Sequence, residues 1–415
     1  MIRILLQPKI SYDAFRIEYV KWLVACHALR LDDRKVLRAI DPECTLSQLR
    51  RNYVYSFSYG QKKVERNNLN IIPGLRDLLF CEDGEINQDG LLRLLAGPEQ
   101  PPDCITDESH RQGLLRSHFQ SLYQEIEKGL TGQTRPDAMD CCKNIFVYDN
   151  MKEAAYWLMD QLQVRTCPYC NRVYTTQSFA TKLRPPFDHF IPKSKHPYFG
   201  LSLFNLVPAC DYCNRKKGEG DPNILVSPDL SDLSEKWLIY PYDEGYDDEN
   251  EKAPFEMRSY PGEGFQFLKA LRGESTRFQL NIQTSGSPKG KQIQNAVTKL
   301  GIKDIYGTHK QEVQKIAQLH YWYSHTYLKQ LLSLVVKNWK DLPPPSQVLL
   351  IGQVKEKLYF ADLAQEDWGN APLNKLKADI LAQLDKYEQT SEIGTDTDNG
   401  KDELKNEQGS NLRPD

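Results

Sequence analysis

The chain has 415 residues, a formal net charge of −3, 40% hydrophobic residues and 26% charged residues. This length predicts two or three domains, and the composition is ordinary for a globular chain that buries apolar cores. The small negative charge excludes a uniformly basic nucleic-acid coat. No apolar run is long enough to cross a bilayer, and Pro8 and Lys9 interrupt the apolar start of the chain. We therefore expect a cytoplasmic protein with no membrane partner.

Residues 1–150 predict a mainly helical N-terminal domain. Between residues 11 and 30, apolar side chains recur at steps of three and four, as on one face of an amphipathic helix. This stripe comprises Phe15, Tyr19, Trp22, Leu23, Cys26 and Leu29. Further along, aromatic residues alternate with smaller ones from Tyr53 to Tyr59, a period that favours a strand with one buried face. Because basic residues flank this run, a surface on which nucleic-acid bases stack is a second interpretation.

The remainder of the chain divides where its composition changes. We expect a cysteine-rich module over residues 151–228, an acidic connecting region over 229–290, a helical region over 291–388 and a disordered tail over 389–415. The acidic stretch 241–256 is typical of a solvated loop. One long helix ending before Pro343 should bury Val313, Ile316, His320, Tyr327, Leu331 and Val335, and a second should bury Leu373, Leu376, Ile380, Leu384 and Tyr387. The expected fold class is therefore mainly α, with one small α+β module.

Four of the ten cysteines are arranged as two Cys-x-x-Cys pairs, Cys167/Cys170 and Cys210/Cys213. The other six show no ligand spacing, which is typical of reduced thiols in a core or on a surface. Each pair can place two sulfurs at one tight turn, so the two pairs together can supply four thiolates to one tetrahedral zinc. Because 39 residues separate the pairs, a folded segment must lie between them. We predict a structural Zn²⁺ that staples the module.

Polar residues follow a spaced pattern between and beside these pairs. Asp188 and His189 are followed sixteen residues later by Asn205, and Asn214 comes nine residues after that. This pattern, with the zinc knuckles around it, resembles the HNH endonucleases of the ββα-metal superfamily in their four-cysteine form. The resemblance is confined to residues 167–218, and the last histidine position of the motif is Asn214 here. It implies a ββα-metal fold for the module and an endonuclease activity.

The residue types also suit this chemistry by themselves. Phosphodiester hydrolysis needs a base that activates water and a cation that stabilises charge on the scissile phosphate. His189 suits the role of the base, since an imidazole is mostly neutral at cytosolic pH. Asp188 and Asn214 offer hard oxygen ligands for Mg²⁺ or Mn²⁺. Asn205 is expected to hold the loop between two strands by hydrogen bonds from its side chain to the backbone, and so to orient His189.

The local charge favours a polyanionic substrate. Residues 161–220 contain nine Lys or Arg and three Asp or Glu, a local charge of +6. Such a cluster is often only a solvated surface, but beside this motif it indicates contact with phosphates of DNA. The residues expected to make that contact are Lys193, Lys195, Arg215, Lys216 and Lys217.

The segment from Asp188 to Gly218, followed by the sequence LIYPYDEGY at 238–246, is similar to the HNH nucleases of bacterial anti-phage operons of the Septu type and of some retron-linked systems. This similarity implies an effector role in antiviral defence and a partner ATPase of the ABC/SMC class. Two other functions stay open. One is a catalytically silent zinc-knuckle protein that binds nucleic acid or recruits a partner, and the other is a toxin-like nuclease that cuts RNA.

Overall fold

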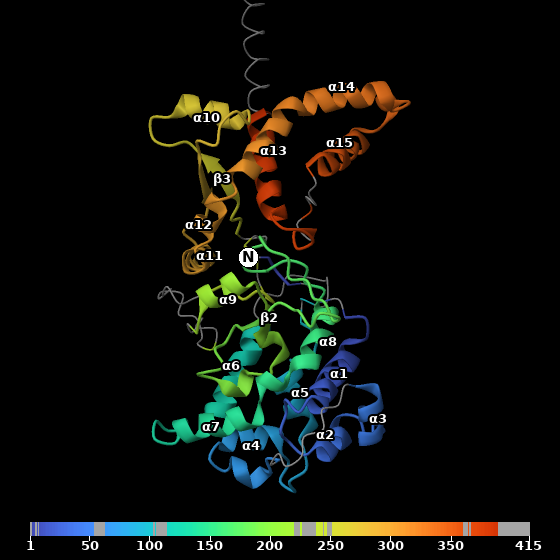
Figure 1. Cartoon of the computed structure of the whole chain (residues 1–415), viewed down its shortest axis with the longest axis vertical. Helices are drawn as coiled ribbons and strands as arrows, with labels where there is room; N and C mark the ends of the chain where they lie inside the picture. The colour runs from blue at the N-terminus through green and yellow to red at the C-terminus, as the bar shows by residue number, and fades with distance from the viewer. Residues whose placement is uncertain are drawn as a thin grey trace, which may run out of the picture. The chain divides into compact units, whose positions relative to one another are not determined.

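A computed structural model of the chain describes residues 2–4, 6, 8–53, 63–102, 104, 114–219, 225, 238–243, 245–246, 251–359, 364 and 367–388. The chain folds into two compact units (Figure 1). The first comprises Met1–Ala253 and Thr284–Gly301, and the second comprises Pro254–Gln283 and Ile302–Asp415. The helical N-terminal region and the cysteine-rich module, expected as separate parts, thus belong to one unit. The expected mainly helical architecture is confirmed.

Eight α-helices precede the cysteine-rich segment in the described part of the first unit. They are α1 (Tyr12–Ala25), α2 (Asp33–Ile40), α3 (Leu46–Asn52), α4 (Pro73–Leu79), α5 (Gln88–Ala96), α6 (Leu114–Glu127), α7 (Arg135–Ile145) and α8 (Lys152–Leu162). Ser11 caps α1 by accepting a hydrogen bond from the Ala14 amide. The predicted stripe is confirmed in part: Phe15, Tyr19 and Leu23 are buried on α1, and Phe15 stacks on Trp157 of α8 with 5.6 Å between ring centroids. Trp22 is only half-buried, and Cys26 and Leu29 lie beyond the end of the helix.

The cysteine-rich segment contains two short antiparallel strands, β1 (Phe187–His189) and β2 (Leu206–Pro208), followed by the helix α9 (Asp211–Lys217). In this pair Asp188 lies opposite Val207, and His189 lies opposite Leu206. The turns η3 (Pro197–Phe199) and η4 (Leu203–Asn205) connect the strands.

The N-terminal helices hold this segment in place. The Tyr19 hydroxyl of α1 donates to the Leu201 carbonyl at 2.7 Å, and the Ser202 hydroxyl donates to the Leu94 carbonyl of α5 at 2.6 Å. Gly97 ends α5 with a φ of +97° and lies so close to the Phe204 ring that a Cβ would come within 2.3 Å of it. Both the positive φ and the close approach require glycine at this position. The strands and α9 therefore rest on a helical scaffold.

The prediction of a solvated acidic loop is wrong for the part of 241–256 that the structure describes, which leaves out residues 244 and 247–250. Tyr242 and Tyr246 are buried, and the Tyr242 hydroxyl donates to the Leu206 carbonyl of β2 at 2.7 Å. Glu251 is only 4% exposed, and its buried carboxylate accepts hydrogen bonds from the Ser285 amide and from the hydroxyls of Ser285 and Ser287. Ser287 also caps α11 (Pro288–Lys299).

The second unit combines a two-stranded sheet with helices. Strand β3 (Phe255–Arg258) pairs with β4 (Gln279–Ile282), and these lie with α10 (Gly264–Leu271) in the region expected to be an acidic connection. The other helices are α12 (Ile302–Gly307), α13 (Lys310–Trp322), α14 (His325–Val335), α15 (Pro344–Tyr359) and one over residues 374–388. The last of these confirms the second predicted helix, in which Leu376, Ile380 and Leu384 are buried. Leu373 is buried just before the helix begins, whereas Tyr387 is 44% exposed, so its predicted burial is wrong.

The long helix predicted before Pro343 is two helices, α13 and α14. Ser324 starts the second by accepting a hydrogen bond from the Tyr327 amide, so the apolar face changes direction at this point. Val313, Ile316 and His320 are buried in α13 as predicted, whereas α14 buries Leu328 and Leu332 and exposes Tyr327, Leu331 and Val335.

Two predictions fall outside the described residues, namely the strand from Tyr53 to Tyr59 beyond its first residue and the disordered tail over 389–415. Among the residues that are described, no helix is both long enough and apolar enough to cross a membrane.

Candidate metal centre and active site

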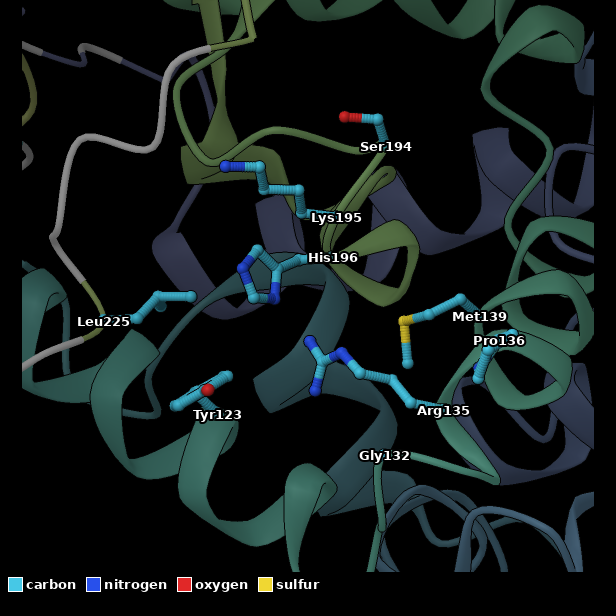
Figure 2. A pocket seen from close by; sticks show the side chains of 9 residues that line it. All are labelled: Tyr123, Gly132, Arg135, Pro136, Met139, Ser194, Lys195, His196 and Leu225. Atoms are coloured by element: carbon cyan, nitrogen blue, oxygen red, sulfur yellow. The ribbon is translucent and has the colours of Figure 1, made fainter.

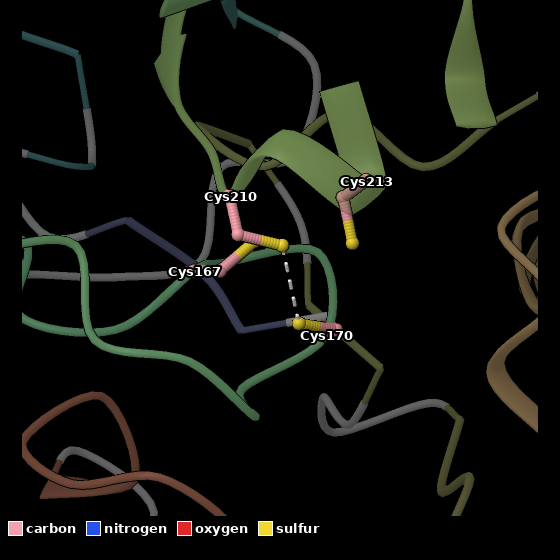
Figure 3. A group of neighbouring side chains, drawn as sticks. All are labelled: Cys167, Cys170, Cys210 and Cys213. Carbon is pink, nitrogen blue, oxygen red and sulfur yellow. Dashed lines mark hydrogen bonds between the residues drawn. The ribbon is translucent and has the colours of Figure 1, made fainter. Parts of the chain in front are cut away.

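The four cysteines of the two pairs converge in the first unit (Figure 3). Cys167 and Cys170 lie on a tight turn, in which the Asn171 amide donates to the Cys167 carbonyl at 2.7 Å. Cys210 immediately precedes α9, and Cys213 lies in its first turn. All four side chains are buried, and their sulfur atoms lie within 4.8 Å of one another.

This cluster can hold a metal such as zinc. A tetrahedral zinc with Zn–S bonds of about 2.3 Å places its sulfurs roughly 3.8 Å apart, and the Sγ atoms of Cys170 and Cys210 are 3.9 Å apart. Burial raises the pKa of the Cys167 thiol well above its usual value, and a cation among the four sulfurs would favour its ionised form. The buried Tyr246 hydroxyl has no hydrogen-bond partner in the described part of the chain, and the Cys213 thiol adds to the effect of burial in raising its pKa.

Asp188 lies in the middle of β1 and is only 3% exposed. Its Oδ2 atom accepts a hydrogen bond from the Tyr169 hydroxyl at 2.5 Å, and the Lys217 Nζ atom lies 3.2 Å from Oδ1 and 3.1 Å from Oδ2. Burial raises the pKa of Asp188, and the Lys217 ammonium opposes that rise. Tyr169 belongs to the turn of the first cysteine pair and Lys217 to α9, so the carboxylate connects both halves of the metal cluster.

The prediction that Lys217 contacts phosphate is wrong, because its side chain is 1% exposed. Besides Asp188, its Nζ atom donates to the His189 carbonyl at 2.9 Å. Lys217 follows Cys213 by four residues, which places both on the buried face of α9. The lysine therefore supplies a positive charge inside the module, and a divalent cation bound to Asp188 would have to share this carboxylate with it.

His189 ends β1 and is half-buried. Its Nε2 atom lies 3.0 Å from the Gly200 carbonyl, which can only accept, so Nε2 carries the proton and Nδ1 is left as the proton acceptor. The pKa of His189 is lowered to about 4, mainly by burial and further by the charges of Lys193 and Lys217. The hydrogen bond to Gly200 opposes this lowering. The imidazole is therefore neutral at pH 7, as a general base must be.

Asn205 makes the hydrogen bonds expected of it. It is fully buried, its Oδ1 atom accepts from the Ile191 amide at 2.6 Å, and its Nδ2 atom donates to the carbonyls of Ile191 at 3.0 Å and Phe199 at 2.9 Å. The Phe190 amide also donates to the Asn205 carbonyl. These bonds fix both ends of the loop between β1 and η3, directly after His189.

The other predicted site residues lie at the surface of α9 and of the loop after β1. Asn214 is half-buried, and its side chain makes no hydrogen bond within the described part of the chain. Arg215 and Lys216 are exposed on α9, as are Lys193 and Lys195 on the loop. Lys193 lies 3.7 Å from an Asp149 carboxylate oxygen, which is an exposed pairing that solvent screens. These four cations remain accessible to a polyanion.

Three residues of the site were not predicted from the sequence. Tyr169 repeats at the same position of both pairs, as Tyr212 in the second, so the repeat itself was an available signal. Tyr148 packs edge-on against His189 with 4.4 Å between ring centroids, and the charge of Arg184 opposes the rise in pKa that burial causes in Tyr148. Tyr148 has no sequence signal, because it lies more than forty residues before the histidine that it touches, whereas Arg184 lies within the basic segment 161–220.

The loop after β1 also forms one wall of a pocket of about 500 Å³ (Figure 2). Lys195 and His196 line it together with Tyr123 and Arg135. The Tyr198 hydroxyl donates to Glu127 at 2.6 Å, so the His196 Nδ1–H group donates to this hydroxyl at 2.8 Å. His196 is thereby part of a buried network behind the pocket wall, which agrees with a structural role and not a catalytic one.

A second group of possible ligands lies in the second unit, where His320, Asp385 and Glu388 bring their ligand atoms within 4.8 Å of one another. His320 Nε2 is 2.9 Å from Asp385 Oδ1, and Lys355 Nζ is 2.5 Å from the same oxygen. The Glu388 carboxylate accepts from the His325 amide at 3.0 Å. Because an ammonium already pairs with Asp385, we interpret this group as an ion-pair network that joins α13, α15 and the helix over 374–388.

No family model, curated protein or solved structure matches this chain in the comparisons with known proteins.

Proposed function

We propose that the protein is a metal-dependent endonuclease that hydrolyses phosphodiester bonds of DNA, with the cysteine-rich segment as an HNH-type ββα-metal module. The observation that carries this proposal is the orientation of His189. Its Nε2–H group is fixed on the Gly200 carbonyl, and its Nδ1 atom is left to accept a proton. The strand pair, α9 and the Asn205 hydrogen bonds support the same interpretation. We further propose an effector role in antiviral defence, with an ATPase of the ABC/SMC class as partner.

In this proposal His189 accepts a proton from the water that attacks the phosphorus. Its lowered pKa keeps it unprotonated, and Asn205 prevents the loop beside it from moving. A Mg²⁺ or Mn²⁺ ion held by Asp188 and Asn214 would supply charge stabilisation at the scissile phosphate. Lys193, Lys195, Arg215 and Lys216 would contact flanking phosphates. The four cysteines would hold a structural Zn²⁺ that fixes Tyr169 and α9 around Asp188.

The test uses supercoiled plasmid and purified protein with Mg²⁺. We expect wild-type protein to convert the plasmid to nicked or linear forms, and we expect His189→Ala to lose that activity. The matched control is His325→Ala, which removes an exposed histidine from the second unit and should cleave normally. Parallel reactions on labelled DNA and RNA would identify the substrate, and preferential cleavage of RNA would favour a toxin-like ribonuclease. Equal activity of wild type and His189→Ala would exclude His189 as the base and so remove the observation that carries the proposal.

A second function is favoured by one observation. Both oxygens of Asp188 already accept hydrogen bonds, from Tyr169 and Lys217, and the carboxylate is buried. In a catalytically silent zinc-knuckle protein that binds nucleic acid or recruits a partner, Asp188 would need no metal ion, and these hydrogen bonds would be its whole role. Binding of DNA without cleavage, over a range of Mg²⁺ and Mn²⁺ concentrations, would support this function in place of the first.

A further inference from the structure

The loop that continues from the first cysteine pair to β1 carries large apolar side chains on its surface. We call residues 171–184 the knuckle loop. Tyr174 and Phe179 are each 56% exposed, and Leu183 is 66% exposed. Single exposed apolar residues are normal on protein surfaces, but three large ones within ten residues of one loop are an unusual concentration.

The charge of this segment is one-sided. Residues 161–187 contain Arg165, Arg172, Lys182 and Arg184 and no Asp or Glu. The Lys182 ammonium lies 4.2 Å from the centroid of the Phe179 ring. Exposed aromatic rings interleaved with cations are the combination that binds single-stranded nucleic acid, because bases stack on the rings while phosphates pair with the cations.

The loop is held in a defined shape. The Cys167 amide donates to the Val173 carbonyl at 2.9 Å, and Ser178 and Leu183 exchange backbone hydrogen bonds of 2.8 and 3.1 Å. The Phe179 ring packs edge-on against the buried Tyr156 with 5.1 Å between centroids. A ring fixed in this way loses little conformational entropy when a base stacks on it.

The knuckle loop leads directly to the candidate active site. Arg184, at its end, lies 5.5 Å from the Phe187 ring of β1, and its charge opposes the rise in pKa that burial causes in Tyr148. Tyr148 packs against His189. A strand lying on the loop would therefore continue towards the proposed base.

We propose that the knuckle loop binds unpaired bases of single-stranded nucleic acid beside the bond that is cut. The position beside the cut bond rests on the proposed nuclease function. The binding of single-stranded nucleic acid does not depend on it. A protein partner would also cover an apolar patch, but the four cations without a carboxylate favour a polyanion.

The test measures binding of a fluorescent oligothymidylate to the full chain by anisotropy, in a His189→Ala background that prevents cleavage. We expect Tyr174→Ala and Phe179→Ala each to weaken binding by roughly 5- to 150-fold, the range for loss of one base–aromatic stack. The matched control is Phe265→Ala in the second unit, because Phe265 is 69% exposed and has Lys269 at 5.0 Å from its ring centroid. It should bind as the background does. An oligouridylate arm shows whether the loop prefers DNA or RNA, and thermal melting shows that each variant is folded.

Undiminished binding by both knuckle-loop variants would overturn the inference, as would an equal loss in the Phe265→Ala control or no binding of either oligonucleotide. Failure of the proposed function is distinguishable from this, because plasmid cleavage by wild-type protein is measured separately. If wild-type protein cleaves plasmid but both variants bind the oligonucleotide as the background does, the nuclease proposal stands and the knuckle loop does not bind the substrate. If the two variants lose binding but wild-type protein does not cleave plasmid, the knuckle loop is a nucleic-acid-binding surface and the nuclease proposal is wrong.

Discussion

The buried ion pair between Lys217 and Asp188 gives the most informative perturbation, Lys217→Met. Methionine keeps much of the aliphatic volume but removes the ammonium that lies 3.1 and 3.2 Å from the two carboxylate oxygens. Both side chains are almost fully buried, so the remaining carboxylate has little water to replace its partner. Removing one partner of such a pair destabilises a protein by about 3–5 kcal/mol. We expect a loss of this size in the free energy of unfolding of Lys217→Met at pH 7, measured by urea denaturation.

Two comparisons separate the ion pair from loss of packing. Lys216→Met changes the exposed neighbour on α9 and should alter stability by no more than about 0.5 kcal/mol. Adding Asp188→Asn to Lys217→Met removes the unpaired charge and should recover much of the loss. If Asp188 faces a divalent cation, Mg²⁺ should stabilise Lys217→Met by about 2.7 kcal/mol at one hundred times its dissociation constant, and should stabilise wild type less, because Lys217 competes for the carboxylate. Lys217→Met that is as stable as Lys216→Met would refute the buried pair, and an absence of Mg²⁺ stabilisation would refute Asp188 as a metal ligand.

Three further predictions concern the structure around the site. Purified protein should contain one zinc per chain by elemental analysis. Cys170→Ser should lose this zinc and unfold locally, since zinc contributes on the order of 10 kcal/mol to folding in small zinc modules. Folded protein that contains no zinc would contradict this prediction. Asn205→Ala should lose on the order of 3 kcal/mol of unfolding free energy, because three buried backbone groups lose their hydrogen-bond partner. A loss too small to measure by urea denaturation would contradict the role of Asn205 in holding this loop. His118 lies on α6, with its Nε2 atom 2.9 Å from the Arg93 carbonyl oxygen. Burial lowers its pKa to about 4 in the folded chain, so its contribution to stability is present above its unfolded pKa of about 6.5 and declines as the pH falls towards 4. His118→Gln should remove about 2 kcal/mol of the stability difference between pH 7 and pH 5, and identical pH dependence in wild type and variant would show that this histidine is protonated in the folded chain.

The local features of the site could be predicted from the sequence because they depend on spacing. The cysteine pairs, the strand ending at His189 and the role of Asn205 each follow from residues within one short segment. Lys217 could not be assigned in the same way, because three adjacent cations look equivalent in a sequence. Only the helical turn separates Lys217, which faces Cys213 and β1, from Arg215 and Lys216, which face solvent.

The scaffold depends on contacts between residues far apart in the chain. Tyr19 donates to Leu201 across 182 residues, and no periodicity in either segment indicates this contact. The break between α13 and α14 at Ser324 was also missed, since apolar residues continue at helical spacing on both sides and only the capping serine marks the change. The division into two units follows from such long-range contacts and not from the changes in composition on which the predicted boundaries were based.

The central claim is that His189 accepts a proton while Asn214 and Asp188 hold a divalent cation. The most direct measurement compares plasmid cleavage by His189→Ala and Asn214→Ala over a Mg²⁺ titration. Loss of the general base should lower the rate by about 10²–10⁴-fold at every Mg²⁺ concentration. Asn214→Ala should be impaired at low Mg²⁺ and recover part of its rate at high Mg²⁺, because it has lost a ligand and kept the base. Near wild-type cleavage by His189→Ala, or its rescue by Mg²⁺ while Asn214→Ala stays inactive, would contradict these roles.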